Sequence, residues 1–384
     1  MSHAAPRPPA YSSGGTLASV LPAVARSLGS SRYASVPDLG LASARRAVVV
    51  LVDGLGHGQL VRRAGHAPFL RSHLPSTRRL DCGFPTTTAA SMGTFGTGTP
   101  TGAHGLVGME VLDPAADRVF NQLSWENGPD PFAWQPVPTV FELLATEGVL
   151  VTRIGPAFFD GSGLTNAALR GGRFVAAARP ADRVAAAVTA VRAAPRSLVY
   201  LYWGEIDKAG HVHGADSWEL VDELETVDRW LGTLAASVAD DTAIYVTADH
   251  GMVDVPFGHR VDLAHEPELL DGVRHAAGEP RGTQLYTRPG AVADVTARWR
   301  ERLGDTAWVT TRDEMVTAGW FGDVRPEVLP RIGDVLALML TDVAVVDTKR
   351  MRPELVRLFG HHGSVTDEER GIPLVSVPAR AHLE

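Results

Sequence analysis

Hydrophobic residues fall into two kinds of segment along this chain: short continuous runs, and longer stretches with helical spacing. Four short runs rich in branched and aromatic residues predict strands, at 46–53, 149–154, 197–203 and 243–247. Such runs are typical of strands buried on both faces of a parallel sheet. Segments 181–194 and 217–238 predict helices between or after them. This alternation indicates an α/β protein with a mostly parallel central sheet and helices on both faces.

The pattern changes between residues 254 and 333. A strand at 282–287, a helix at 290–303 and a strand at 307–310 are followed by a passage rich in proline. We expect a smaller inserted α+β subdomain here, of the kind that caps a catalytic core.

The two flanking stretches, 16–253 and 334–384, form the predicted α/β core. The chain is expected to return to this core through apolar runs at 334–340 and 343–347. Residues 1–15 are rich in Pro, Ala and Ser and are predicted to be a disordered arm.

Composition narrows the possible functions of the chain. Its 384 residues are 45% hydrophobic, which excludes a disordered protein. The net charge is −8, and only Lys208 and Lys349 are lysines, so we expect no surface that binds nucleic acid or an anionic membrane. No apolar run is long enough to cross a membrane. Nothing in the sequence indicates a partner protein.

The single cysteine, Cys82, excludes an internal disulfide and any metal site built from several thiolates. A metal would therefore bind Asp, Glu and His. The stretch 17–25 contains Pro22 and has helical spacing, so we interpret it as an amphipathic helix rather than a signal core. We expect a cytoplasmic protein.

Polar residues that suit catalysis follow the predicted strands, where ligands bind in open α/β sheets. Asp53 closes the first strand, although a lone Asp there is more often a cap or turn residue. Asp207 and His211 are four residues apart, which places both on one side of a helical turn. Further candidates are the adjacent pair Asp249 and His250, and His362 near the end of the chain.

Together these six residues supply three carboxylates and three imidazoles. That mixture suits two zinc-like divalent ions, which can clamp the attacking and leaving oxygens of a displacement at phosphorus. Thr88, at the predicted start of a small-residue helix, is the candidate nucleophile because a helix N-terminus favours an anion. An N-cap cluster without catalytic function is the alternative interpretation of segment 84–91.

The order of these motifs resembles the alkaline phosphatase superfamily, most of all its nucleotide pyrophosphatase/phosphodiesterase branch. In that branch a strand ending in Asp-Gly precedes a Phe-Pro-Thr-x-Thr segment whose last Thr is the nucleophile. The matching residues are Asp53-Gly54, Phe84-Pro85-Thr86-Thr87-Thr88, Thr97-Gly98 and His104-Gly105.

The resemblance implies an alkaline phosphatase-like fold and two metal ions, with zinc expected. One ion would be held by Asp207, His211 and His362, and the other by Asp53, Asp249 and His250, with Thr88 contacting the metals. Ser91 stands where the branch has an Asn that helps hold the phosphoryl oxygen, so Ser91 is a second catalytic candidate.

The resemblance also implies a reaction. Thr88 would attack a phosphoester, such as that of a nucleotide, and form a covalent phosphothreonine that water then hydrolyses. A phosphomonoesterase, a phosphonate hydrolase and a mutase like phosphoglycerate mutase share this metal layout and remain alternatives. A metal-binding protein without catalysis is the alternative from another class. A sulfatase is disfavoured because Cys82-Gly83-Phe84-Pro85 does not match its motif.

The predicted insertion suggests a lid. Because it rejoins the core shortly before His362, it is expected to contact the leaving group. Trp308, Trp320 and Phe321 would stack on a base in that arrangement, although aromatic residues in such a segment more often form its own small core.

Overall fold

A computed structural model gives the fold of the chain, and it describes residues 6–380. Its centre is a seven-stranded sheet in the order β2-β17-β8-β1-β7-β5-β6. The five strands from β8 to β6 run parallel, whereas β17 is antiparallel to both β8 and β2. The prediction of a mostly parallel central sheet is confirmed. The strands are β1 (Arg46–Val52), β2 (Arg78–Asp81), β5 (Leu150–Gly155), β6 (Arg173–Ala176), β7 (Ser197–Trp203), β8 (Thr242–Thr247) and β17 (Gly371–Val377).

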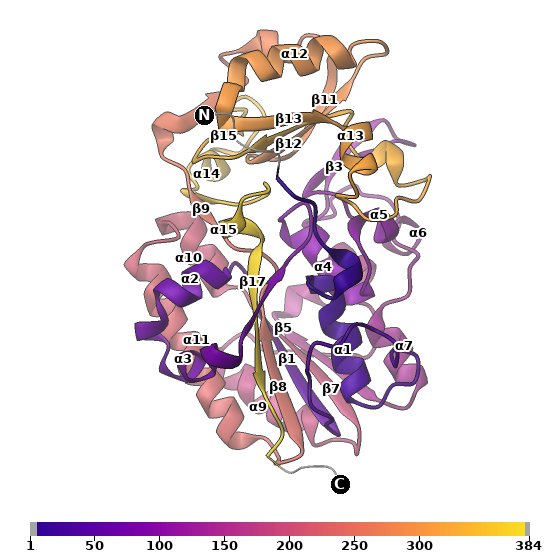
Figure 1. The fold of residues 1–384 in the computed structure, drawn as a ribbon, viewed down its shortest axis with the longest axis vertical. Helices are drawn as coiled ribbons and strands as arrows, with labels where there is room; N and C mark the ends of the chain where they lie inside the picture. The colour runs from indigo at the N-terminus through magenta and orange to yellow at the C-terminus, as the bar shows by residue number, and fades with distance from the viewer. Residues whose placement is uncertain (1–5, 381–384) are drawn as a thin grey trace.

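Helices cover both faces of this sheet. The helices of the core are α1 (Val20–Ser27), α2 (His57–Arg62), α3 (Pro68–His73), α4 (Thr88–Thr97), α5 (Thr101–His104), α6 (Pro131–Trp134), α7 (Val140–Thr146), α8 (Gly163–Ala168), α9 (Pro180–Val191), α10 (Glu205–His213), α11 (Trp218–Ser237) and α15 (Asp367–Arg370). Figure 1 shows α2, α3, α10 and α11 on one side of the sheet and α1, α4 and α7 on the other. The two helices predicted at 181–194 and 217–238 correspond to α9 and α11.

The stretch 17–25 is part of the folded core, as its helical spacing predicts. Leu17, Val20, Leu21 and Val24 are all fully buried there. Pro22 lies in the first turn of α1, where a missing N–H leaves no helical hydrogen bond unmade. Across residues 6–380, no helix has both the length and the apolar character needed to cross a bilayer.

A second sheet lies above the carboxyl ends of the central strands (Figure 1). Its strand order is β11-β12-β14-β13, with α12 packed against it and a two-stranded pair β10-β15 beside it. We call residues 260–346 the cap. Its elements are β10 (Arg260–Asp262), β11 (Val273–Glu279), β12 (Gly282–Thr287), α12 (Val292–Leu303), β13 (Ala307–Thr311), α13 (Arg312–Thr317), β14 (Val335–Met339) and β15 (Ala344–Val346).

The predicted boundary at residue 333 is wrong. The runs expected to return the chain to the core, 334–340 and 343–347, contain β14 and β15 instead. β14 lies between β12 and β13, and β15 pairs with β10. A buried apolar strand has the same sequence pattern in either sheet, so pairing alone decides to which one it belongs. The chain returns through α14 (Pro353–Val356) and β16 (Gly360–His361), which pairs with β9 (Val253–Asp254).

The prediction that residues 1–15 form a disordered arm is also wrong for residues 6–15, the part of this segment that the structure describes. Tyr11 donates its hydroxyl to the carbonyl of Trp320, and the Phe84 N–H donates to the Tyr11 oxygen. Arg370 donates to the carbonyl of Arg7. These contacts hold the described part of the segment against the folded chain, and its average composition does not reveal them. Residues 1–5 of the predicted arm lie outside the described residues.

A buried ion pair joins the cap to the core. Arg281, in the turn between β11 and β12, donates to both carboxylate oxygens of Glu369 in α15, at 2.8 and 3.0 Å. Both side chains are fully buried. Glu369 also accepts from the N–H of Ser364, two residues after His362. The pair therefore holds the segment that carries His362 against the cap.

Replacing Arg281 with Met should destabilise the protein strongly. The change leaves the Glu369 carboxylate buried without its counter-charge, which costs about 3–5 kcal/mol. Urea unfolding measures the loss. Glu369→Gln added to Arg281→Met should recover part of it, because the remaining buried group is then neutral.

The exposed pair Arg62 and Glu368 provides the matched control, since its side chains are 47% and 42% exposed. Arg62→Met should cost less than about 1 kcal/mol. Equal losses for Arg62→Met and Arg281→Met would show that the buried pair has no special role.

Candidate metal centre and active site

Three neighbouring parallel strands bring the predicted acidic residues to one edge of the sheet. Asp53 follows β1, Asp249 and His250 follow β8, and Asp207 lies in the first turn of α10, just after β7. Strands β8, β1 and β7 are adjacent, with Leu51 paired to both Thr247 and Tyr202. Because parallel strands end at the same edge, residues distant in sequence meet there.

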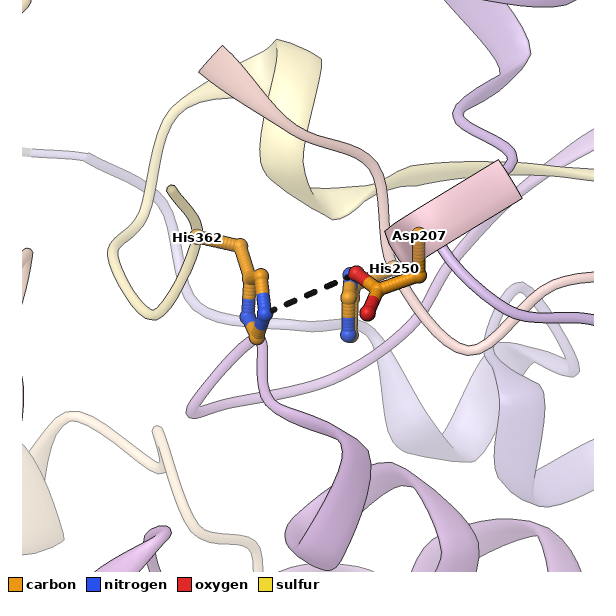
Figure 2. A group of neighbouring side chains, drawn as sticks. All are labelled: Asp207, His250 and His362. Carbon is orange, nitrogen blue, oxygen red and sulfur yellow. Dashed lines mark ion pairs between the residues drawn. The ribbon is translucent and has the colours of Figure 1, made fainter. Parts of the chain in front are cut away.

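Asp207, His211 and His362 form a compact set of ligand atoms. Asp207 Oδ1 lies 3.4 Å from His211 Nε2 and 3.9 Å from His362 Nε2, and the two histidine nitrogens are 3.3 Å apart. Ligands about 2.0–2.2 Å from a tetrahedral zinc ion are separated by about 3.4 Å. Asp207 and His362 are far apart in the sequence but lie side by side (Figure 2). These three residues therefore have the spacing of a metal site.

Asp53, Asp249 and His250 form the second set. His250 Nε2 lies 3.6 Å from Asp53 Oδ1 and 3.4 Å from Asp249 Oδ2. The His250 ring stacks on that of His362, with centroids 3.7 Å apart. A ring nitrogen of His250 also lies within 4.8 Å of ligand atoms of Asp207 and His362, so this residue adjoins both sets (Figure 2).

Backbone carbonyls fix the orientation of the histidine rings. Nδ1 of His211 lies 2.8 Å from the carbonyl of Gly360, and Nδ1 of His362 lies 2.8 Å from that of Thr86. Nδ1 of His250 faces the carbonyl of Gly251 at 3.0 Å. A ring that donates from Nδ1 presents Nε2 as a free lone pair, which is the arrangement found around metal-binding histidines.

The carboxylates show that the site fits cations. Asp53 Oδ1, Asp207 Oδ1 and Asp249 Oδ2 are buried and accept no hydrogen bond from any described residue. Burial raises the pKa of Asp53 well above its usual range, and the nearby carboxylates of Asp249 and Asp207 raise it further. Burial lowers the pKa of His362, which keeps its ring neutral. Buried unpaired oxygens and neutral imidazoles are the donors that divalent ions require.

Thr88 is the first residue of α4, and its hydroxyl points at these ligands. Thr88 Oγ1 lies 3.2 Å from His250 Nε2. The first N–H groups of a helix have no partner within it, so they face the same space as this hydroxyl. Thr88 therefore has the position expected for a nucleophile.

Ser91, the other catalytic candidate, lies one turn further into α4. Its hydroxyl donates to the carbonyl of Asp249 at 2.8 Å, and the side chain is buried. In this arrangement Ser91 fixes the end of β8 rather than facing the space beside Thr88. Its role at the phosphoryl oxygen stays a prediction, and that role requires the hydroxyl to turn away from this carbonyl.

Tyr202, which the sequence patterns do not single out, and Gly54, which belongs to the Asp53-Gly54 motif, complete the site. Tyr202 donates its hydroxyl to Asp53 Oδ2 at 2.5 Å. Gly54 has a φ of +75°, and a Cβ there would lie 2.9 Å from the Cα of Asp207. The glycine thus lets the turn after β1 approach α10 closely. Only the register of β1 against β7 reveals the position of Tyr202.

A cavity of about 510 Å³ opens beside the metal-binding residues, with Asp53, Thr88 and Asp207 in its wall. All its lining residues lie between positions 53 and 207, so the expected lid over 254–333 does not form this wall. Trp320 and Phe321 are buried and pack edge-on against Phe84, while Trp308 packs on Trp320. These aromatic residues support the Phe-Pro-Thr segment and are not placed to stack on a base.

Comparisons with known proteins agree with this geometry. The sequence profile of the family described as type I phosphodiesterase / nucleotide pyrophosphatase matches residues 47–365. Ectonucleotide pyrophosphatase/phosphodiesterase family member 7 of Mus musculus is 42% identical over 64 residues, and the human protein is 41% identical over 63. The match to the mouse protein covers 15% of this chain and 15% of that protein.

Two solved structures share the fold over most of both chains. Murine ectonucleotide pyrophosphatase/phosphodiesterase 5, as an inactive variant in complex with AMP, is 17% identical with a TM-score of 0.69 and covers 88% of this chain and 90% of its own. Phosphonoacetate hydrolase from Sinorhizobium meliloti 1021, in complex with phosphonoacetate, is 19% identical with a TM-score of 0.68 and covers 89% and 92%.

Asp53→Asn should raise the stability of the metal-free protein. The change removes one of three crowded carboxylates. Because the pKa of Asp53 is raised in the folded state, its ionised form destabilises the fold increasingly as the pH rises. With chelator at pH 8, we expect the melting temperature to increase by several degrees. The increase should shrink as the pH is lowered, because Asp53 of the unchanged protein then becomes protonated.

The same variant should bind one zinc ion less and gain less stability from zinc than the unchanged protein. Thermal unfolding with chelator and with zinc, together with zinc analysis, measures both effects. Asp182→Asn, which changes an exposed carboxylate, should change neither the zinc content nor the stability gained from zinc. A lower melting temperature of Asp53→Asn in chelator would contradict the explanation that repulsion between carboxylates destabilises the metal-free protein.

Proposed function

Because the chain belongs to the type I phosphodiesterase / nucleotide pyrophosphatase family of the alkaline phosphatase superfamily, we propose that it is a metal-dependent phosphoester hydrolase. Phosphodiesters and nucleotide pyrophosphates are the proposed substrates, and the reaction passes through a covalent phosphothreonine. The observation that carries this proposal is the position of the Thr88 hydroxyl, 3.2 Å from His250 Nε2 and beside both ligand sets.

Asp207, His211 and His362 would hold one divalent ion, and Asp53, Asp249 and His250 the other. The imidazole and carboxylate donors at tetrahedral spacing favour zinc. Such ions neutralise phosphate charge and lower the pKa of a nearby hydroxyl. Three histidines and three aspartates converging from four segments support a pair of ions rather than a single one.

In the proposed reaction, residues of the chain make the new bond to phosphorus and stabilise the developing charge. Thr88 Oγ1 attacks phosphorus in line with the leaving oxygen, whose bond to phosphorus breaks. N–H groups in the first turn of α4 donate to a phosphoryl oxygen and offset its growing charge. Water then attacks the phosphothreonine, releases the phosphorylated product and restores the hydroxyl.

We also propose a cytoplasmic location for the protein. The support is its single cysteine, Cys82, which is buried and has no second thiol with which to pair. The proposed partner is a small phosphoester such as a nucleotide, and the murine structural relative was solved in complex with AMP. Phosphonate hydrolysis is the second candidate, because phosphonoacetate hydrolase shares the fold over 89% of this chain.

Zinc-loaded protein should hydrolyse bis-p-nitrophenyl phosphate in preference to p-nitrophenyl phosphate. Thr88→Ala should lower kcat for the diester by about 10³-fold or more, because the nucleophile is lost. Zinc content should stay unchanged, and Thr88→Ser should recover measurable turnover. Absorbance of p-nitrophenolate and zinc analysis provide the measurements.

Other outcomes would redirect the proposal. A preference for the monoester indicates a phosphatase, and phosphate release from phosphonoacetate indicates a phosphonate hydrolase. Full activity in Thr88→Ala contradicts the phosphothreonine. Bound zinc without turnover of any of these compounds favours a metal-binding protein without catalysis.

A further inference from the structure

Part of the lining of the cavity beside Thr88 has no role in the proposed chemistry. Its volume of about 510 Å³ is in the range of sites for small organic molecules. Away from the metal ligands its walls are mostly apolar, with Phe159, Leu164, Leu169 and Phe174 among them. Phe158, also in the lining, is 73% exposed. These walls fit an apolar organic group.

Arg153 breaks the apolar character of this lining. It lies on β5, paired with Tyr200 of β7 and Phe174 of β6, and both of these neighbours also line the cavity. The side chain is 9% exposed. Its guanidinium lies 5.7 Å from the centre of the Phe174 ring. Arg153 therefore places a positive charge inside a largely apolar chamber.

Within the described chain, Arg153 has neither a hydrogen bond nor an ion pair, and its Nε is buried without a partner. Four other arginines are at least as buried, and the guanidinium of each has an anionic or a carbonyl partner, although Nε of Arg370 is unpaired like that of Arg153. Arg183 pairs with Glu205, Arg281 with Glu369 and Arg370 with Asp81, while Arg331 donates to the carbonyls of Gly105 and Trp134.

This contrast indicates a missing counter-ion. Burying a guanidinium is costly unless an anion or several acceptors replace its water. Burial accordingly lowers the pKa of Arg153, and the opposing influence of Asp160 comes from an exposed side chain that forms no ion pair with it. A cation kept in this state in the wall of a cavity is suited to bind an anionic ligand group.

We infer that Arg153 binds a second anionic group on the substrate, a carboxylate or a phosphate, at the part of the cavity wall that it shares with Phe174 and Tyr200. This inference rests on the proposed function. It narrows the substrate class to phosphoesters whose organic group combines an apolar body with a negative charge. Arg153 is then a residue that determines specificity, and it takes no part in breaking the bond to phosphorus.

A matched pair of unreactive ligands tests the inference by calorimetry with the zinc-loaded, full-length protein. Benzylphosphonate presents the phosphonate and an apolar ring, and 4-carboxybenzylphosphonate adds the carboxylate. We expect the carboxylated ligand to bind about 10- to 100-fold more tightly, as charge-assisted hydrogen bonds allow. Benzene-1,4-bis(methylphosphonate) forms the second arm and shows whether a phosphate-like group is preferred to a carboxylate.

Arg153→Met should abolish this preference while leaving the affinity for benzylphosphonate within about threefold. Arg173→Met is the control. Arg173 precedes Phe174 on β6, is exposed and donates to Thr152 rather than lining the cavity. This variant should keep the full preference. Thermal unfolding checks that the variants fold, and Arg153→Gln replaces the Met variant if that one does not.

Equal binding of neutral and charged ligands by the unchanged protein would overturn the inference and leave the proposed function standing. A preference that persists in Arg153→Met would also overturn it. Failure of every ligand to bind the zinc-loaded protein would contradict both the inference and the proposed function.

Discussion

The crowding of three carboxylates, two of them fully buried, is the constraint on which the candidate site depends. Asp53, Asp207 and Asp249 lie together because three adjacent parallel strands end at one edge, and the sheet offers them too few hydrogen-bond donors. Their unpaired oxygens require positive charge from elsewhere. Burial keeps the His362 ring neutral, so this histidine offers a lone pair and no counter-charge. Under the proposed function, divalent cations would provide the compensating charge.

The cap supports segments that carry site residues and does not act as the lid that the sequence predicts. Its aromatic residues support the segment before Thr88 through Phe84, and its Arg281 holds the segment after His362 through Glu369. Thr88, the proposed nucleophile, and His362, a proposed metal ligand, therefore both depend on contacts with an insertion that contributes no side chain to the cavity wall. Correct folding of the cap is then a condition for assembling the site, even though the chemistry takes place below it.

Charge is distributed unevenly along the cavity. Its lining includes the carboxylates of Asp53 and Asp207, the proposed ligands of the cations, and a single arginine that lies beside an aromatic ring. Under the proposed function, a substrate that uses both parts of the lining carries negative charge at two places, with an apolar part between. Such a two-point arrangement fixes the orientation of the bound molecule, because a group that fits only one end leaves the other charge unsatisfied.

The sequence by itself determined the central strands, the helices between them and the types of ligand at the strand ends, because these depend on local patterns and on the rule that parallel strands end together. It did not determine the extent of the cap, since β14 has the same apolar pattern as a core strand and only its pairing with β12 and β13 assigns it. The tertiary structure likewise decided three features of side chains. Tyr202 contacts Asp53, Ser91 donates to the carbonyl of Asp249, and Arg153 is unpaired. Each of these depends on which residues face one another across strands or helices far apart in sequence, and local periodicity carries no information about such partners.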